Sequence, residues 1–238
     1  MARGWAVIDS LRQVAFAGMP HATAVVDARN RLLVADMVSS GQLEKFIIGV
    51  EDSEQLQKTA DWLSEKLTEQ ALKNASYSVD AASLVFAHTI LDDALSSFIE
   101  ITSEAAPAYW QHRVEKKSIE LGMLKDRSWD DVLKMIIQKE IAAIGRNDSL
   151  VKKSELLHAV CKPKAAPRNE YRFDAATLLQ IDKDRQDIVH GDLLGGEIVE
   201  IETKLAYLRE TWNYFFIMMH ESFGLQIDAA AIADGKHP

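Results

Sequence analysis

An arginine and a histidine stand five positions apart in residues 185–191, which read Arg-Gln-Asp-Ile-Val-His-Gly. Histidine titrates near neutral pH, so His190 can take a proton from a hydroxyl group. The guanidinium of Arg185 offers a planar fork of N–H donors that matches two phosphate oxygens. The pair could therefore cleave RNA without a metal ion, His190 deprotonating a ribose 2′-hydroxyl and Arg185 stabilising the phosphorane. Gln186 and Asp187 could orient the imidazole or the RNA backbone.

The helix that carries this pair has clear predicted ends. Asp174 is the expected N-cap, and Gly191 is the expected glycine after the last turn, where it is free to adopt a positive φ. Arg185 belongs to the apolar stripe of this helix, which is made by Leu178, Ile181 and Ile188. A cation on such a stripe is either buried with partners or held at an interface, because unpaired burial is costly.

Arg185 and His190 do not share one face of an ideal helix. Five residues at ~100° each leave the two side chains about 140° apart. Either the helix unwinds at His190, or the site is completed across a two-fold axis between two copies of the chain. An axis beside Arg185 would also account for a cation on an apolar stripe.

The segment before this helix carries a local excess of positive charge. Residues 151–172 contain six lysines and arginines against two glutamates, in a chain whose formal net charge is −9. The four basic residues nearest the helix are Lys162, Lys164, Arg168 and Arg172. They form either a solvated loop or a strip that faces RNA phosphates and leads into the helix of Arg185.

Apolar periodicity predicts further helices on both sides of this region. Residues 52–72 begin with a capping box of Asp52 and Gln55, and after a polar break at residues 74–78 the next helix is capped by Asp80 and runs to Ile101. The remaining predicted helices span residues 108–124, 126–144, 149–160 and 197–223, with Trp129 on an inner face, Ser149 as a cap and Gly224 as the final stop.

The N-terminal region has two interpretations. Pro20 could open a helix over residues 21–38, or residues 24–26 and 32–34 could form a hairpin. The β-branched run at residues 46–50 favours the hairpin. We therefore expect a mainly α chain, with an N-terminal extension at residues 1–75 that includes a small β hairpin, followed by a helical bundle at residues 76–238.

Composition narrows the class of protein. Hydrophobic residues make up 47% of the 238, which suits a globular chain with a sizeable core. The single cysteine, Cys161, fits a reducing compartment and argues against a zinc cluster. The N-terminus lacks a signal-peptide core, and no uninterrupted apolar run approaches the ~20 residues of a membrane span. We expect a cytoplasmic protein with no metal, no cofactor and no membrane association.

The string at residues 185–191 resembles the signature of the HEPN family, whose members are helical-bundle proteins and often metal-independent RNases. The resemblance covers residues 80–223 and implies an endoribonuclease of the toxin–antitoxin or defence type. It also implies a symmetric homodimer in which both copies of Arg185 and His190 line one cleft, with RNA as substrate and an antitoxin as a further partner. Gln186 departs from the family, which commonly has asparagine there.

A second resemblance points to another class of function. Residues 90–95 (Ile-Leu-Asp-Asp-Ala-Leu) and the Arg-x4-His string are similar to mannitol-operon repressor-like proteins. That resemblance implies a non-catalytic regulatory or interaction protein, in which Arg185 and His190 are structural and pair across helices.

The other histidines give weaker signals. His88 lies four residues before Asp92 and could share a metal with it, but no third ligand has suitable spacing, so His88 is expected to be a core or interface histidine. His158 is expected on the surface.

Overall fold

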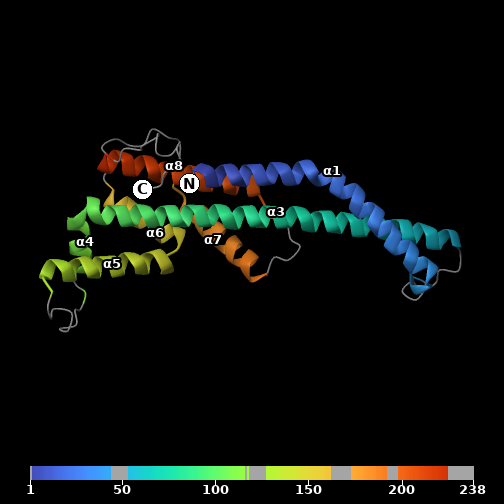
Figure 1. Ribbon diagram of the computed structural model, residues 1–238, viewed down its shortest axis with the longest axis horizontal. Helices are drawn as coiled ribbons and strands as arrows, with labels where there is room; N and C mark the ends of the chain where they lie inside the picture. The colour runs from blue at the N-terminus through green and yellow to red at the C-terminus, as the bar shows by residue number, and fades with distance from the viewer. Residues whose placement is uncertain are drawn as a thin grey trace. The chain divides into compact units, whose positions relative to one another are not determined.

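The computed structural model describes residues 2–43, 53–115, 117, 127–161, 173–191 and 198–224. Across these ranges the chain is helical and contains no strand, so the prediction of a mainly α protein is confirmed. The helices, shown in Figure 1, are α1 (Ala2–Ser39), α3 (Ser53–Ala105), α4 (Pro107–Val114), α5 (Trp129–Asn147), α6 (Leu150–Val160), α7 (Ala175–His190) and α8 (Ile201–Phe223).

The chain forms two compact units. Apart from Met1, unit 1 comprises residues 87–186 and 202–238, and unit 2 comprises residues 2–86 and 187–201. Helices α3 and α7 each contribute residues to both units. The boundary expected at residue 75 therefore falls inside a continuous helix, α3.

Unit 2 is built on α1 and the first part of α3, which run antiparallel. Arg12 Nη1 lies 2.6 Å from Asp80 Oδ1, and Asn30 Nδ2 donates to Thr68 Oγ1 at 3.1 Å. Near the start of α3 the two helices share a small apolar cluster, composed of Val34, Met37, Val38, Leu43, Leu56, Ala60 and Leu63.

The hairpin expected at residues 24–34 is wrong, because those residues lie inside α1. Val34, Met37 and Val38 pack at helical spacing of three and four against α3, whereas a strand would bury alternate residues. The expected loop at residues 27–30 also contains no glycine, which the tight hairpin turns favour. The run at residues 46–50 lies outside the described residues.

Pro20 lies inside α1 and does not open a helix. A proline removes one backbone N–H donor and crowds the carbonyl four residues earlier, so helices commonly bend there. Figure 1 shows that α1 does bend part-way along its length.

Helix α3 is longer than predicted, and the polar break expected at residues 74–78 is wrong. The polar side chains there bond within the helix: Ser78 Oγ donates to the Asn74 carbonyl at 2.8 Å, and Gln70 donates to Asn74 Oδ1 at 3.0 Å. Asp80 caps no helix and instead pairs with Arg12. Residues with weak helix propensity are tolerated because tertiary contacts outweigh them. The Asp52 cap lies outside the described residues.

Helix α3 is also apolar. An 18-residue window in it has a mean hydropathy of 1.2, so it is the one helix of the described part that could cross a membrane by length and composition. Of that window, 44% is buried inside the protein, and the core helix of a soluble protein can have the same length and composition. Hydropathy is therefore only weak evidence for a membrane span, and a soluble chain is compatible with it.

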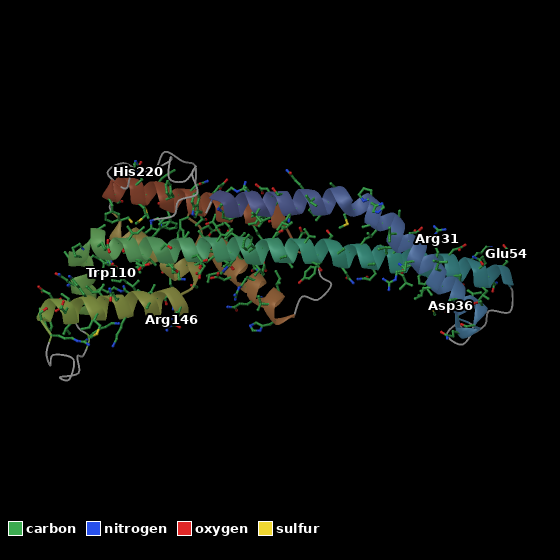
Figure 2. The ribbon with its side chains drawn as sticks, viewed as in Figure 1. Arg31, Asp36, Glu54, Trp110, Arg146 and His220 are labelled. Atoms are coloured by element: carbon green, nitrogen blue, oxygen red, sulfur yellow. The ribbon has the colours of Figure 1, made fainter. Side chains whose placement is uncertain are left out.

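Unit 1 surrounds the second part of α3. Phe98 of α3 packs near Phe216 of α8, with ring centroids 6.4 Å apart. Trp110 of α4, labelled in Figure 2, is fully buried and donates its indole N–H to Thr102 Oγ1 at 3.1 Å. Since α3 also bonds to α6 and α7, as described below, it is the central helix of this unit.

Several predicted helix ends are confirmed. Ser149 caps α6 by accepting a bond from Lys152 N at 3.4 Å, and Gly224 follows α8 with a φ of 65°. Helix α5 begins after Ser128, whose Oγ accepts from Asp131 N at 3.2 Å.

Trp129 was expected on an inner face, but it is 56% exposed because it occupies the first position of α5. The second half of the helix expected over residues 108–124 lies mostly outside the described residues.

Lys153 of α6 is buried in unit 1 with its ammonium fully bonded. Its Nζ lies 2.6 Å from Asp92 Oδ1, 3.0 Å from Ser96 Oγ and 2.9 Å from the Gly145 carbonyl. Three acceptors match the three N–H donors of the ammonium, which makes its burial tolerable. This network connects α3, the end of α5 and α6, so Lys153 is not part of a solvated basic strip.

We predict that Lys153→Met lowers the free energy of unfolding by about 3 kcal/mol, because the apolar stem remains but Asp92 loses its partner. Urea unfolding measures this change. The neighbouring Lys152→Met is the control: Lys152 is exposed and lies 3.8 Å from Asp148, so its loss costs less than about 0.5 kcal/mol. Equal unfolding midpoints for both variants would contradict the proposed importance of this network.

Candidate functional site

Helix α7 starts where its sequence predicts. Asp174 Oδ1 accepts a bond from Ala176 N at 3.0 Å, and Oδ2 accepts one from the Thr177 hydroxyl at 2.5 Å. These bonds lower the pKa of the Asp174 carboxyl, and the bond from the Thr177 hydroxyl has the largest effect. The hydroxyl of Tyr207 on α8 accepts from Asp174 N at 2.8 Å. The N-cap is therefore confirmed and is also bonded to a neighbouring helix.

The middle of α7 is joined to two other helices through carboxylates. Asp182 Oδ1 lies 2.7 Å from His88 Nε2 of α3. Asp184 Oδ2 lies 2.6 Å from Lys204 Nζ of α8, and Asp184 Oδ1 accepts a bond from Gln180 at 2.8 Å. Both contacts are largely shielded from solvent, with side-chain exposures between 12% and 15%. They fix the position of α7 within unit 1.

Arg185 lies one turn beyond Asp182 on α7 and is half-buried. Leu178 and Ile181, on the same stripe, are fully buried, as predicted. The Nε of Arg185 is enclosed by protein, and within the described ranges it has no hydrogen-bond acceptor. The described residues also give Arg185 no carboxylate partner, in contrast to Lys153 and Lys204. Packing therefore encloses part of the Arg185 side chain, and no described carboxylate neutralises its charge.

The remaining predicted site residues follow at the end of α7. Gln186 and His190 are exposed, and Asp187 is half-buried. The helix continues through His190, and Gly191 follows it with a φ of 79°. Because α7 does not unwind before His190, one copy of the helix directs Arg185 and His190 to different faces.

The predicted RNA-facing residues of the preceding loop lie outside the described residues. This applies to Lys162, Lys164, Arg168 and Arg172. Their role stays a prediction.

His88 has a partner that the sequence does not reveal. Its neighbour on the same helix, Asp92, is bonded to Lys153, and the carboxylate that contacts His88 is Asp182, 94 positions away. His88 is thus an interface histidine, as expected, but its partner comes from the helix that carries Arg185. No spacing rule could have found this pair, because it depends on how α3 and α7 pack.

His158 of α6 is not the surface residue that was expected. It is half-buried against three aromatic rings, with centroid distances of 5.3 Å to Phe173, 5.5 Å to Tyr214 and 5.1 Å to Phe215. Its Nε2 is enclosed and has no hydrogen-bond partner in the described part of the chain. Burial lowers the pKa of His158, since charging the ring would cost solvation.

The described residues offer no cluster of three or more histidine, cysteine or acidic side chains that could hold a metal ion. Cys161 is buried, with its Sγ 3.6 Å from Met219 Sδ. Burial raises the pKa of its thiol to about 11, so the thiol stays protonated at neutral pH.

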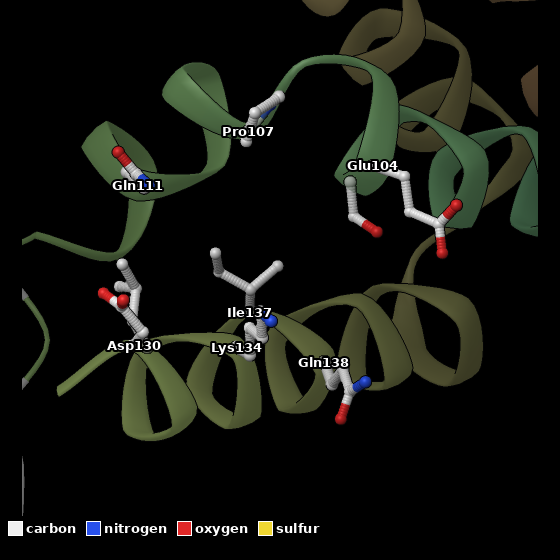
Figure 3. A pocket seen from close by; sticks show the side chains of 9 residues that line it. Glu104, Pro107, Gln111, Asp130, Lys134, Ile137 and Gln138 are labelled. Atoms are coloured by element: carbon white, nitrogen blue, oxygen red, sulfur yellow. The ribbon is translucent and has the colours of Figure 1, made fainter. Parts of the chain in front are cut away.

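A hollow lined by both polar and apolar side chains lies between the end of α3, α4 and α5 in unit 1 (Figure 3). Its volume is about 610 Å³, and its charged lining residues are Glu104, Asp130 and Lys134. It contains no histidine and no residue of α7. It therefore does not coincide with the site predicted around Arg185.

Unit 2 exposes an apolar groove between α1 and α3. The groove is lined by Val7, Ile8, Leu11, Ala15, Ser78, Val79, Ala82, Ser83 and Phe86. Leu11 is 61% exposed and Phe86 is 43% exposed. Large apolar side chains gathered in this way are typical of a surface that contacts another protein.

Comparison of the chain with protein-family models, with curated proteins and with solved structures found no match.

We predict that the burial of His158 makes the protein less stable in mild acid. The unfolded chain protonates this histidine near its ordinary pKa of 6.5, whereas the folded chain keeps it neutral to a lower pH. Unfolding therefore takes up a proton in this range, and the free energy of unfolding falls as the pH drops below about 6.5 through the lowered pKa.

Urea unfolding of wild type and His158→Phe between pH 7.5 and 5 measures this effect. The phenylalanine keeps the aromatic packing but does not titrate, so its stability should change less with pH. His112→Gln, at an exposed position, should keep the wild-type slope. A His158→Phe slope identical to that of wild type would exclude His158 as the source.

Proposed function

We propose that the protein is a metal-independent endoribonuclease of the HEPN type, acting on RNA in the cytoplasm in a toxin–antitoxin or defence setting. The observation that carries the proposal is the environment of the Arg185 guanidinium. Its guanidinium is held on a buried stripe without a carboxylate partner among the described residues, on the same helix as the exposed His190. The resemblance of residues 185–191 to the HEPN signature supports the assignment of roles.

In the proposed reaction His190 takes the proton of the ribose 2′-hydroxyl, and the 2′-oxygen attacks the adjacent phosphorus. Arg185 stabilises the negative charge that develops on the phosphorane oxygens. The bond from phosphorus to the 5′-oxygen then breaks, and that oxygen gains a proton. The products are a 2′,3′-cyclic phosphate and a 5′-hydroxyl. Gln186 and Asp187 orient the imidazole or the RNA, and Lys162, Lys164, Arg168 and Arg172 bind RNA phosphates.

The intact end of α7 favours a site shared by two copies of the chain. Arg185 and His190 lie about 140° apart around one helix. In a two-fold dimer, Arg185 of one copy can face the same cleft as His190 of the other copy. The proposed enzyme is therefore a homodimer with two composite sites.

We predict that Arg185→Ala and His190→Ala each reduce RNA cleavage at least 100-fold, since each removes one chemical role. Cleavage of a labelled RNA by purified protein measures this loss. Arg146→Ala and His220→Ala, which alter an exposed arginine and an exposed histidine near other helix ends, are the controls and should keep wild-type rates. Wild-type cleavage by both site variants would disprove the assignment.

The composite site makes a sharper prediction. Mixing the two inactive variants gives heterodimers in which one site has both wild-type residues and the other has neither. If equal amounts of the two variants exchange subunits freely, half of all dimers are mixed. One of the two sites in each mixed dimer is complete, so about a quarter of the wild-type activity should return. If no activity returns although mass spectrometry detects mixed dimers, both residues must act within one copy.

The second candidate is a non-catalytic regulatory protein on the same scaffold, and the exposed apolar groove of unit 2 favours it. Under this alternative the groove binds an apolar helix of a partner protein. The same alternative expects Arg185 to pair across helices, and the described residues contain no such pair.

A further inference from the structure

His88, Asp182 and Arg185 form a group within unit 1 that the Arg-x4-His string does not include. His88 Nε2 lies 2.7 Å from Asp182 Oδ1. Asp182 and Arg185 are three residues apart on α7, so their Cβ atoms are roughly 5–6 Å apart on neighbouring positions of one helix face. His88 is therefore bonded to a carboxylate that lies one turn before the proposed phosphate-binding arginine on α7, in the same copy of the chain.

Two other shielded charges of unit 1, Lys153 and Asp184, are each paired with an opposite charge and have at least one further bond. Lys153 has three acceptors, and Asp184 has both Lys204 and Gln180. By contrast, Asp182 Oδ2 and Arg185 Nε are enclosed and have no hydrogen-bond partner in the described ranges. A fold that leaves both atoms unbonded gives up stability, because each enclosed polar group without a partner costs about 1–3 kcal/mol. An enclosed polar group without a partner in a native structure calls for an explanation, and a catalytic role is one such explanation.

The contact with Asp182 also determines which nitrogen of the His88 ring faces the carboxylate. When the Nε2–H of His88 donates to the carboxylate, Nδ1 is the nitrogen left for proton transfer. The carboxylate holds the orientation of the ring, and side-chain exposures of 13% and 14% leave the pair at the edge of solvent. These are the properties of an oriented proton donor.

We propose that His88 is the general acid of the ribonuclease site and gives its proton to the 5′-oxygen as the bond from phosphorus to that oxygen breaks. This inference rests on the proposed function. His190 of the other copy accepts the proton of the 2′-hydroxyl, so one proton enters the protein and one leaves it in each transesterification. Asp182 is a positioning residue, because it acts through His88 and does not contact the RNA.

The pH dependence of cleavage tests this role. The charged groups that face His88 are Asp182 of α7 and, one turn along α3, Asp92, whose charge is offset by Lys153 of α6. Lys204 of α8 is paired with Asp184. Wild type should show a bell-shaped profile, with an acidic limb from the base and an alkaline limb from the acid.

His88→Gln should lower the rate about 100-fold and abolish the alkaline limb, because the proton donor is gone. Asp182→Asn should keep the alkaline limb but lower the rate, since the imidazole is no longer held in place by the carboxylate. The matched control is Lys204→Met, which breaks the equally short and equally shielded pair between α7 and α8. It should keep the bell shape, because the contact of His88 with Asp182 remains, although the rate falls with the loss of one contact that positions α7.

A substrate that needs no general acid separates chemistry from folding. Uridine 3′-(p-nitrophenyl phosphate) releases nitrophenolate, which leaves without a proton. His88→Gln should cleave this substrate within a few-fold of wild type, whereas Arg185→Ala and His190→Ala should remain inactive on it. Rescue on this substrate also shows that the His88→Gln protein is folded.

Subunit mixing gives a second readout, because His88 and Arg185 act in the same copy. His88→Gln mixed with His190→Ala should recover about a quarter of the wild-type activity on RNA, and His88→Gln mixed with Arg185→Ala should recover none.

The two proposals fail in different ways. In the first case, wild type cleaves RNA through Arg185 and His190, but His88→Gln keeps the alkaline limb or loses the same fraction of activity on both substrates. The role of His88 is then wrong, and the enzyme assignment stands. If wild-type protein cleaves neither substrate, the enzyme assignment is wrong and the role of His88 falls with it.

Discussion

Two carboxylates that stand two residues apart on α7 determine where the proposed site lies. Asp182 and Asp184 are too well shielded to remain unpaired, so each requires a cation or an N–H donor from a neighbouring helix. Asp182 meets His88 of α3, and Asp184 meets Lys204 of α8. These contacts fix the rotation of α7 about its axis and thereby place Arg185 on the buried stripe. The Nε of Arg185 is enclosed there, and the proposed stabilisation of a phosphorane depends on an arginine that is already in position.

The same requirement for paired charges extends through unit 1. Lys153 brings together α3, the end of α5 and α6 through one ammonium group. A buried ion network of this kind contributes little net stability compared with apolar packing, but it penalises any arrangement in which a partner is lost. The helices around α3 are therefore constrained in register as well as in contact. Such constraint suits the proposed site, in which His88 and Arg185 act together.

The sequence predicted the helices of unit 1 better than those of unit 2. Local chemistry defines the ends of α6 and α7, because Ser149 and Asp174 bond to backbone within their own first turn. The expected break in α3 and the expected hairpin failed for the opposite reason. Residues 24–34 and 74–80 have weak local preferences, and packing between distant segments decides their structure. The partner of His88 could not be predicted either, since it depends on a contact between residues 94 positions apart.

The central claim is that Arg185 acts on a phosphodiester through the ribose 2′-hydroxyl, without a metal ion. The most direct measurement is the chemistry of the RNA ends that purified protein produces in the presence of excess EDTA. The account predicts 2′,3′-cyclic phosphate and 5′-hydroxyl ends, and no cleavage where a 2′-deoxynucleotide precedes the scissile bond. Loss of all cleavage with the chelator, or products with 3′-hydroxyl and 5′-phosphate ends, would contradict it.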